Sequence, residues 1–305
     1  MMRGKVTSML MPSNEPRSGG HGSNLKQFTA LNDRLALLII AGDYLFAIAV
    51  AAAAIVAQST LATLAAIVLI AGRQVAFLNL VHAAAHYSLF STRKANNRAD
   101  ALIGYPILDA VRPYRSYHLQ HHRDVARKSP DRFDYLHDKL PGPDAGPWRR
   151  AMIVVIKPLC GFAGFGFVRS TIDACRENPA FASKLASYWG VVVGLFWWAG
   201  HLGSLLVYWV VPLVWLYPAF YFWAEMSDHY AARDEARNQR GLFYMLFIKG
   251  HEMYHAVHHK YPAIPFYRIR AANQYLRSHG EEIEESRGFL DFMRILCTPS
   301  PDVRG

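Results

Sequence analysis

The residues best suited to chemistry in this chain are its histidines, because ten of the fourteen fall in four short windows. Residues 82–86 read HxxxH, residues 118–122 read HxxHH, residues 251–259 end in a second HxxHH, and residues 225–229 place a histidine four positions after a glutamate. On a helix, positions i, i+3 and i+4 share one face, so each window directs its imidazoles toward one point. Imidazole is a good ligand for iron, zinc and copper. The set is too large for one ion and suits two. The nine candidate ligands are His82, His86, His118, His121, His122, His229, His255, His258 and His259.

The elements that must position these histidines are long apolar stretches. The chain is 52% hydrophobic and only 18% charged, which excludes a disordered chain and argues against an ordinary soluble globule. A helix needs about 20 apolar residues to cross a bilayer. Residues 35–57, 61–80, 183–200 and 205–223 meet that requirement in two closely spaced pairs. We therefore predict an all-α integral membrane protein with four transmembrane helices in two hairpins.

Charge distribution orients this arrangement. The turns near residues 58–60 and 200–204 contain no Lys or Arg, whereas most of the basic residues lie elsewhere outside the spans. The positive-inside rule then places both termini in the cytosol. We expect a cytosolic helical cap from residues 81–150 and 225–280. The first and the Glu225–His229 windows would lie at the cytosolic ends of the second and fourth spans, and the other two histidine windows in the cytosolic regions. The net charge of +10 is assigned to the membrane border, so no nucleic acid partner is expected.

The remaining segments are predicted from composition. Residues 1–27, rich in Gly, Ser and Pro, are expected to be a disordered cytosolic tail, and residues 281–305 a C-terminal tail. Residues 28–280 then form the membrane domain, in which residues 152–168 favour an interfacial segment. Three cysteines without a CxxC pair exclude a disulfide framework.

Three further polar residues accompany this pattern. Asp43 and Arg73 are charges inside apolar spans, and each lies nine residues from the expected cytosolic boundary. Such charges are usually paired or functional. We predict an ion pair between them; the alternative is that Arg73 binds a substrate carboxylate. His251, one turn before His255, is expected to support the metal ligands rather than to be a tenth ligand.

The three histidine boxes resemble those of integral-membrane fatty acid desaturases, and the resemblance covers about residues 35–280. The Pro-containing stretch at residues 261–267 is similar to the segment that follows the family's third box. The resemblance implies a four-span protein with a di-iron site in its cytosolic cap. Glu225 and His229 match a family element in which Asn and His lie four positions apart. Because Glu replaces the Asn here, Glu225 is expected to ligate or bridge iron directly.

The family performs O₂-dependent desaturation, hydroxylation or ketone formation. The three-residue gap in the first box is similar to that of acyl-lipid desaturases and carotenoid ketolases, so the leading expectation is a fatty acyl desaturase acting on a lipid or another hydrophobic substrate. A related hydroxylase, a carotenoid ketolase and an amino-acid-derived desaturase of the dihydrorhizobitoxine type stay open. The non-redox alternatives are a zinc hydrolase, which would leave six histidines unexplained, and a metal transporter, which would place its ligands nearer the bilayer midplane.

Electrons for such a reaction must come from another protein. The sequence contains no cytochrome b5-like HPGG segment, no ferredoxin cysteine pattern and no GxGxxG loop. A separate donor of the ferredoxin or cytochrome b5 type is therefore implied.

Overall fold

A computed structural model describes residues 25–126, 145–230 and 232–297 of the chain. Within these residues the structure is helical and contains no strand, only an isolated bridge between Asn238 and Glu285. Most of the expected N-terminal tail, residues 1–24, lies outside the described part. The short 3-10 helix η1 (Lys26–Phe28) is the first element of the described part, and Leu25 before it is buried against α15 and its neighbours.

Four helical segments are long and apolar enough to cross a membrane, as predicted. They are α2 (Asp33–Ala57), α3 (Thr60–Ala85), α10 (Pro179–Trp198) and the run Leu202–His229. The last run consists of α11 (Leu202–Leu205), the π-helical η5 (Leu206–Val210), α12 (Val211–Val214) and α13 (Leu216–His229). The second segment continues five residues beyond its predicted end and the fourth six residues. These helices therefore carry His82 and His229 themselves.

Helix α3 is the central element of the fold. Its apolar window is 56% buried, against 22% for α2 and 11% for α10. It packs on α2, on α13, and on the π-helical turn η6 (Tyr244–Ile248). Gly72 allows the last contact, because a Cβ atom there would collide with the carbonyl oxygen of Leu246. The small side chain brings the segment before the third histidine box close to α3.

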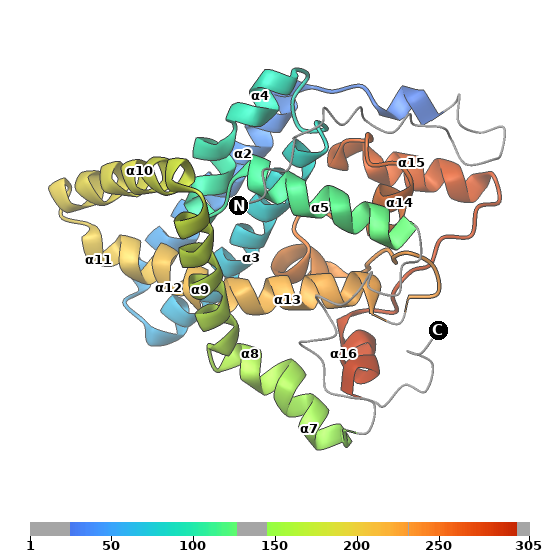
Figure 1. Cartoon of the computed structure of the whole chain (residues 1–305). Coiled ribbons are helices and arrows are strands. Elements are labelled where there is room, and N and C mark those ends of the chain that lie inside the picture. Colours follow the sequence, from blue (N-terminus) through green and yellow to red (C-terminus); the bar gives the residue numbers. More distant parts are fainter. Residues whose placement is uncertain (1–24, 127–144, 231, 298–305) are drawn as a thin grey trace, which may run out of the picture.

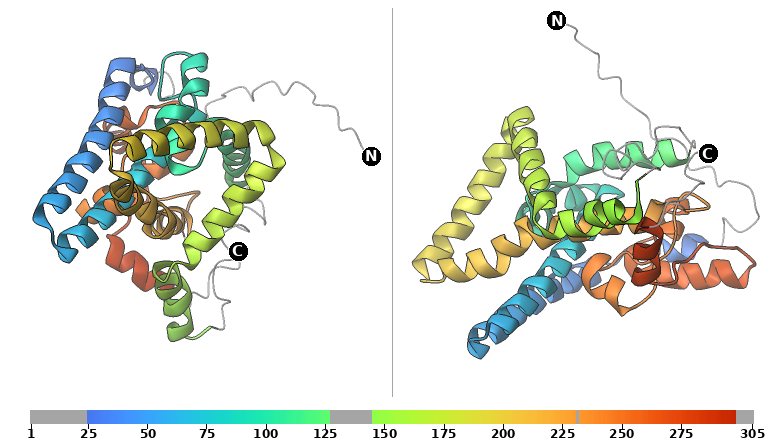
Figure 2. Two further views of the ribbon diagram at one scale, coloured as in Figure 1. Left: turned by 90° about the vertical axis from the view of Figure 1, so that its left-hand side faces the viewer. Right: turned by 90° about the horizontal axis from the view of Figure 1, so that it is seen from below.

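The histidine-bearing end of the molecule is built from short helices. Figure 1 shows α5 (Val111–Ala126), α14 (His255–Lys260) and α15 (Phe266–Ser278) gathered at the right, near the ends of α3 and α13. The joined ends of α2 and α3 and of α10 and α11 project to the opposite side, which Figure 2 also shows. The remaining helices between α3 and α5 are α4 (Arg93–Arg98), η2 (Asp100–Gly104) and η3 (Tyr105–Ile107).

The stretch expected to be interfacial and part of the expected C-terminal tail are both helical. The region around residues 152–168 is a bent helix pair, because α7 (Pro147–Ala151), η4 (Met152–Ile156) and α8 (Lys157–Leu159) meet α9 (Phe162–Glu177) at 61°. Helix α16 (Phe289–Cys297) lies in the expected C-terminal tail. Its Phe292 and Leu296, spaced i and i+4, are buried in the main core, so the folded unit extends past residue 281.

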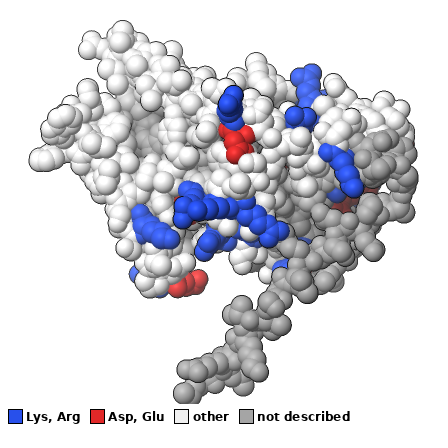
Figure 3. Space-filling view, turned by 90° about the horizontal axis from the view of Figure 1, so that it is seen from above, with Lys and Arg blue, Asp and Glu red and all other residues white. Residues whose placement is uncertain are grey.

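The surface of the apolar helices is itself apolar. Leu38, Val56 and Trp198 are 69%, 83% and 83% exposed. Figure 3 shows Lys and Arg side chains gathered over the middle and right of one face, while the two lobes at the upper left carry no charged side chain. Exposed apolar helices of this length are typical of a lipid-facing surface.

Candidate metal centre

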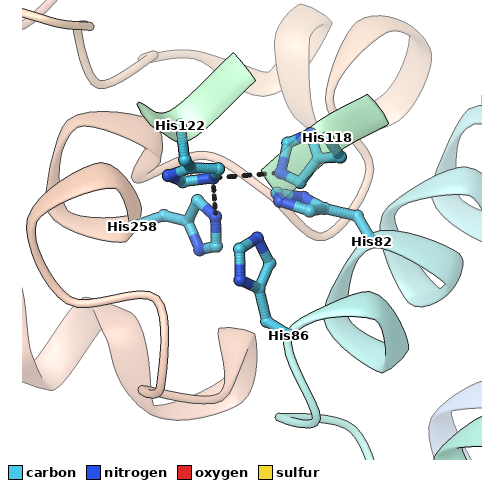
Figure 4. Close-up of side chains that lie close together, drawn as sticks. All are labelled: His82, His86, His118, His122 and His258. Atoms are coloured by element: carbon cyan, nitrogen blue, oxygen red, sulfur yellow. Dashed lines mark hydrogen bonds between the residues drawn. The ribbon is translucent and has the colours of Figure 1, made fainter. Parts of the chain in front are cut away.

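The structure brings all nine predicted histidines together in two adjacent groups that could each hold a metal ion. The ligand atoms offered within each group lie within 4.8 Å of one another. Figure 4 shows the side chains of the larger group pointing toward a common centre. The larger group contains five histidines, and the smaller one contains four. The five are His82, His86, His118, His122 and His258; the four are His121, His229, His255 and His259.

Helical periodicity decides which histidine joins which group. On α5, His118 and His122 are four residues apart and share a face, whereas His121 is rotated by about 100° from His122 and faces the other group. Helix α14 repeats the division, with His255 and His259 in the four-histidine group and His258 in the five-histidine group. Each HxxHH box therefore contributes to both groups.

The remaining ligand candidates come from helix ends. His82 lies in the last turn of α3, His86 caps that helix, and His229 ends α13. Arg115 of α5 fixes the end of α3, because its guanidinium donates hydrogen bonds to the carbonyl oxygens of Ala84 and Ala85 at 2.9 and 2.7 Å. The first box is thus held against α5.

Nitrogen atoms face each other at the centre of both groups. The Nε2 atom of His122 lies 3.0 Å from that of His118 and 3.2 Å from that of His258. In the other group, the Nε2 atom of His229 lies 3.2 Å from that of His121 and 3.1 Å from that of His255. The two groups touch where the rings of His122 and His259 stack at 4.2 Å.

This donor set fits metal ions. The Nε2 atoms of His82 and His86 are buried and have no hydrogen-bond partner among the described residues. A buried polar atom without a partner is costly, so these lone pairs require a cation or an unseen donor. Five and four convergent imidazoles are the nitrogen-rich environment that iron, zinc and copper accept.

Burial also keeps most of these imidazoles in the ligating form. Desolvation, followed by the repulsion of neighbouring histidines, holds the pKa values of His118, His122, His258 and His259 well below their ordinary range. The same causes lower the pKa of His121 to about 3. These rings are neutral at pH 7, and neutral imidazole is the form that binds metal.

Glu252 is the principal residue of the site that our reading of the sequence missed. Its Oε2 atom lies 2.7 Å from Nδ1 of His82, and its Oε1 atom lies 3.0 Å from Nδ1 of His255. Burial raises the pKa of Glu252, but the two histidines lower it by more than burial raises it. The pKa of Glu252 is therefore well below its usual range. Glu252 and a second carboxylate, that of Asp228, also explain why the pKa of His255 differs from those of its neighbours. Burial lowers the pKa of His255, but the two carboxylates raise it overall.

The signal that could have identified Glu252 is its position one turn before His255. Its contact with His82 gives no local signal, because 170 residues separate the two. A second buried pair, Lys249 with Asp228, lies beside it, and Oδ2 of Asp228 is 3.7 Å from Nδ1 of His255.

His251 lies outside both groups and takes part in a different network. Its Nε2 atom lies 2.6 Å from Oδ2 of Asp43, and Oδ1 of that carboxylate lies 3.2 Å from Nη1 of Arg73. Arg73 also donates from Nη2 to the carbonyl oxygens of Met245 and Leu246, both at 3.2 Å. The structure thus places Asp43 and Arg73 together, and His251 beside them.

Glu225 also lies outside the two groups, but it lines a cavity that adjoins them. A small cavity, with room for about one water molecule, is bounded by His82 and His118 of one group and His255 of the other. The wall of the cavity also contains Asn79, Tyr114, Ala224, Glu225 and Lys249. A molecule in this cavity would meet ligand candidates of both groups at once.

The residues that form this site lie in the part of the chain that is similar to known proteins. The model of a family described as fatty acid desaturase matches residues 58–287, which contain both histidine groups. The chain is also similar to the dihydrorhizobitoxine desaturase of Bradyrhizobium elkanii. The two are 26% identical over 261 residues, and the match covers 72% of each chain.

Proposed function

The chain belongs to the fatty acid desaturase family, as its histidine boxes predicted, and from this premise we propose that it is an O₂-dependent membrane oxidoreductase holding two iron ions. The observation that carries the proposal is the division of nine buried or partly buried, mostly neutral histidines into groups of five and four. Iron bound there would supply the activation of O₂ that removal of hydrogen from an unactivated C–H bond requires. Family membership favours this chemistry over a zinc hydrolase or a metal transporter.

We assign the histidines of each group as the ligands of one ion. The four-histidine group is one ligand short of its neighbour, and Glu225 lies one turn before His229 on α13. Glu225 is therefore proposed to complete that group, directly or through water. The cavity that Glu225 shares with His255 supports this assignment.

The proposed membrane arrangement is two hairpins with both termini in the cytosol. The common direction of the joined helix ends and the lack of Lys and Arg at residues 58–60 and 200–204 support it. Residues 81–150 and 225–280 would then contribute the cytosolic cap, at the membrane surface rather than at its midplane.

The role of the protein residues is to position the substrate and to exclude water. Two neighbouring carbons of the substrate are proposed to lie at the position of this small cavity, which would have to widen to admit them, beside His82, His118 and His255. Tyr114 and Ala224 would restrict their movement. Desaturation removes one hydrogen from each carbon. The balanced reaction converts CH₂–CH₂, O₂, two electrons and two protons into CH=CH and two waters. The electrons are proposed to come from a separate ferredoxin or cytochrome b5 type protein.

The leading substrate candidate is an acyl chain of a membrane lipid, because the proposed membrane arrangement of the exposed apolar helices would bring the cavity close to the hydrocarbon region. A second candidate is a small amino-acid-derived molecule. It is favoured by the name of the Bradyrhizobium elkanii relative and by the polar cavity lining from Asn79, Glu225 and Lys249. An acyl chain gains nothing from such groups, whereas a substrate with charged ends does.

Metal analysis and product profiling test the proposal. Purified protein should contain two irons per chain, and cells expressing it should accumulate one new unsaturated compound that cells expressing His258→Ala lack. A product in the lipid fraction supports the acyl substrate, and one in the water-soluble fraction supports the small molecule. Full activity with one zinc and no iron would refute the proposed chemistry.

A further inference from the structure

We propose that Glu252 is a positioning residue shared by both metal sites. One of its carboxylate oxygens orients a histidine of the five-histidine group, and the other orients a histidine of the four-histidine group. The inference rests on the proposed function, because it takes the two histidine groups as two ion sites. It adds a specific role for a residue that is not itself a ligand candidate.

The geometry of the two contacts carries the inference. Oε2 of Glu252 meets Nδ1 of His82 at 2.7 Å, and Oε1 meets Nδ1 of His255 at 3.0 Å. His82 belongs to the five-histidine group and His255 to the four-histidine group. An ionised carboxylate only accepts hydrogen bonds, so both imidazoles must carry their proton on Nδ1. This tautomer leaves the Nε2 lone pair of each ring free for a metal ion.

The other ends of the two rings agree with this tautomer. Nε2 of His82 is buried without a hydrogen-bond partner among the described residues, as expected for an atom reserved for a cation. Nε2 of His255 lies 3.1 Å from Nε2 of His229 and 3.0 Å from Nε2 of His259, at the centre of its group.

The backbone around Glu252 is fixed against α3, the helix that carries His82. The amide of Glu252 donates to the carbonyl oxygen of Lys249 at 2.9 Å, and that oxygen also accepts from Nδ2 of Asn79. Asn79 lies one turn before His82 on α3, so the same helix holds the loop and the histidine. Gly250, at φ +52°, lies so close to Ala76 of α3 that a Cβ atom would not fit. The segment that carries Glu252 therefore has a fixed position relative to His82.

Two conservative substitutions separate positioning from packing. Glu252→Gln preserves size but has only one acceptor oxygen, and its amide would present N–H groups to the second imidazole. That ring would then have to move its proton to Nε2, where it blocks the metal. Glu252→Asp keeps two acceptor oxygens on a side chain one methylene shorter. A positioning role therefore predicts that Asp is tolerated better than Gln, and a packing role predicts the reverse.

Metal titration of the full-length protein is the decisive experiment. Wild type, Glu252→Gln, Glu252→Asp and the control Glu281→Gln are titrated with Fe²⁺ and with Co²⁺ against a chelator. Glu281 is a suitable control because its carboxylate accepts hydrogen bonds from Lys260 and Tyr261 at the end of α14 and not from a histidine. We expect two ions in wild type and in the control, at least one ion bound about 10–100-fold more weakly in Glu252→Gln, and a smaller loss in Glu252→Asp. Equal affinities in Glu252→Gln and wild type, or better binding by Gln than by Asp, would overturn the inference.

A spectroscopic measurement on wild type protects the test against misfolded variants. Long-range ¹⁵N–¹H NMR of histidine-labelled chain, purified with and without zinc, should show His82 and His255 protonated at Nδ1. A ring protonated at Nε2 and not at Nδ1 would overturn the role of Glu252. A wild-type chain that binds no transition metal would contradict the proposed function instead, while the NMR result still decides the positioning role.

Discussion

The guanidinium of Arg73 lies 3.2 Å from the carboxylate of Asp43, so the two charges inside the apolar helices α2 and α3 neutralise each other. Both side chains are largely shielded, at 14% and 6% exposed. The second oxygen of Asp43 contacts His251, and the second nitrogen of Arg73 contacts the backbone of η6. The pair thus connects α2 and α3 with the segment that precedes the third histidine box.

Replacing one partner of this ion pair should destabilise the protein more than replacing both. Asp43→Asn and Arg73→Gln should each lower the free energy of unfolding by about 3–5 kcal/mol, because each leaves an uncompensated buried charge. The double variant should recover part of the loss. Thermal unfolding of the detergent-purified proteins measures all three. If Arg73→Gln keeps wild-type stability and raises only the KM, Arg73 binds substrate instead.

Single histidine substitutions should empty one site rather than both. His258→Ala removes a member of the five-histidine group and His121→Ala a member of the four-histidine group. We expect the iron content of each variant to fall to about one ion per chain and turnover to be lost, because the reaction needs both ions. Elemental analysis checks this against His279→Ala, an exposed histidine of the C-cap of α15. Unchanged iron in His258→Ala would contradict the assignment.

The sequence predicted those features that depend on local pattern. Span length and the i, i+3, i+4 spacing of histidines are local, and they led to the four apolar helices and to the nine clustered rings. The same spacing does not tell which ring of an HxxHH box joins which group, because that depends on the rotation of α5 and α14 against each other. Glu252 was missed because its contact with His82 crosses 170 residues. Helix α16 was missed although its apolar residues follow helical spacing, because the short stretch lies between mostly polar residues in the sequence.

Acidification should destabilise the metal-free protein. Burial lowers the pKa values of His118, His122, His258 and His259 well below 6.5, and that of His121 to about 3. Below pH 6.5 the unfolded chain binds protons at these positions and the folded chain does not. Each such histidine then removes up to about 1.4 kcal/mol of stability per pH unit, down to its folded pKa.

The pH effect is measurable as a fall in the melting temperature between pH 7 and pH 5 in chelator-treated protein. His255, whose pKa is raised, opposes it but is a single residue. His121→Ala should show a shallower dependence than wild type, because one of the lowered groups is gone. A melting temperature that stays constant over this range would contradict the neutral state of the buried rings.

Glu225 should affect iron in the four-histidine group specifically. Glu225→Gln keeps the size of the side chain but removes its charge, so we expect one of the two ions to bind about 10–100-fold more weakly if the carboxylate contacts it directly or through water. Mössbauer spectra of the iron-loaded variant should show one altered signal and one unchanged signal. Identical spectra and activity in Glu225→Gln and wild type would leave Glu225 as a wall residue of the cavity.

The cavity itself can be tested by filling it. Ala224 lines the cavity on α13 and is 4% exposed, whereas Ala219 on the same helix is fully buried and lies outside the cavity wall. Leucine at either position overpacks the interior, at a cost of about 1–3 kcal/mol. Only Ala224→Leu should also displace the substrate, and a shift of about 1 Å can reduce turnover by about 100-fold. We therefore expect Ala224→Leu to retain two irons but lose most of its turnover. Ala219→Leu should keep the wild-type iron content and the wild-type turnover per folded chain. Equal losses of turnover per folded chain in the two variants would mean that the cavity next to the histidines does not hold the reacting carbons.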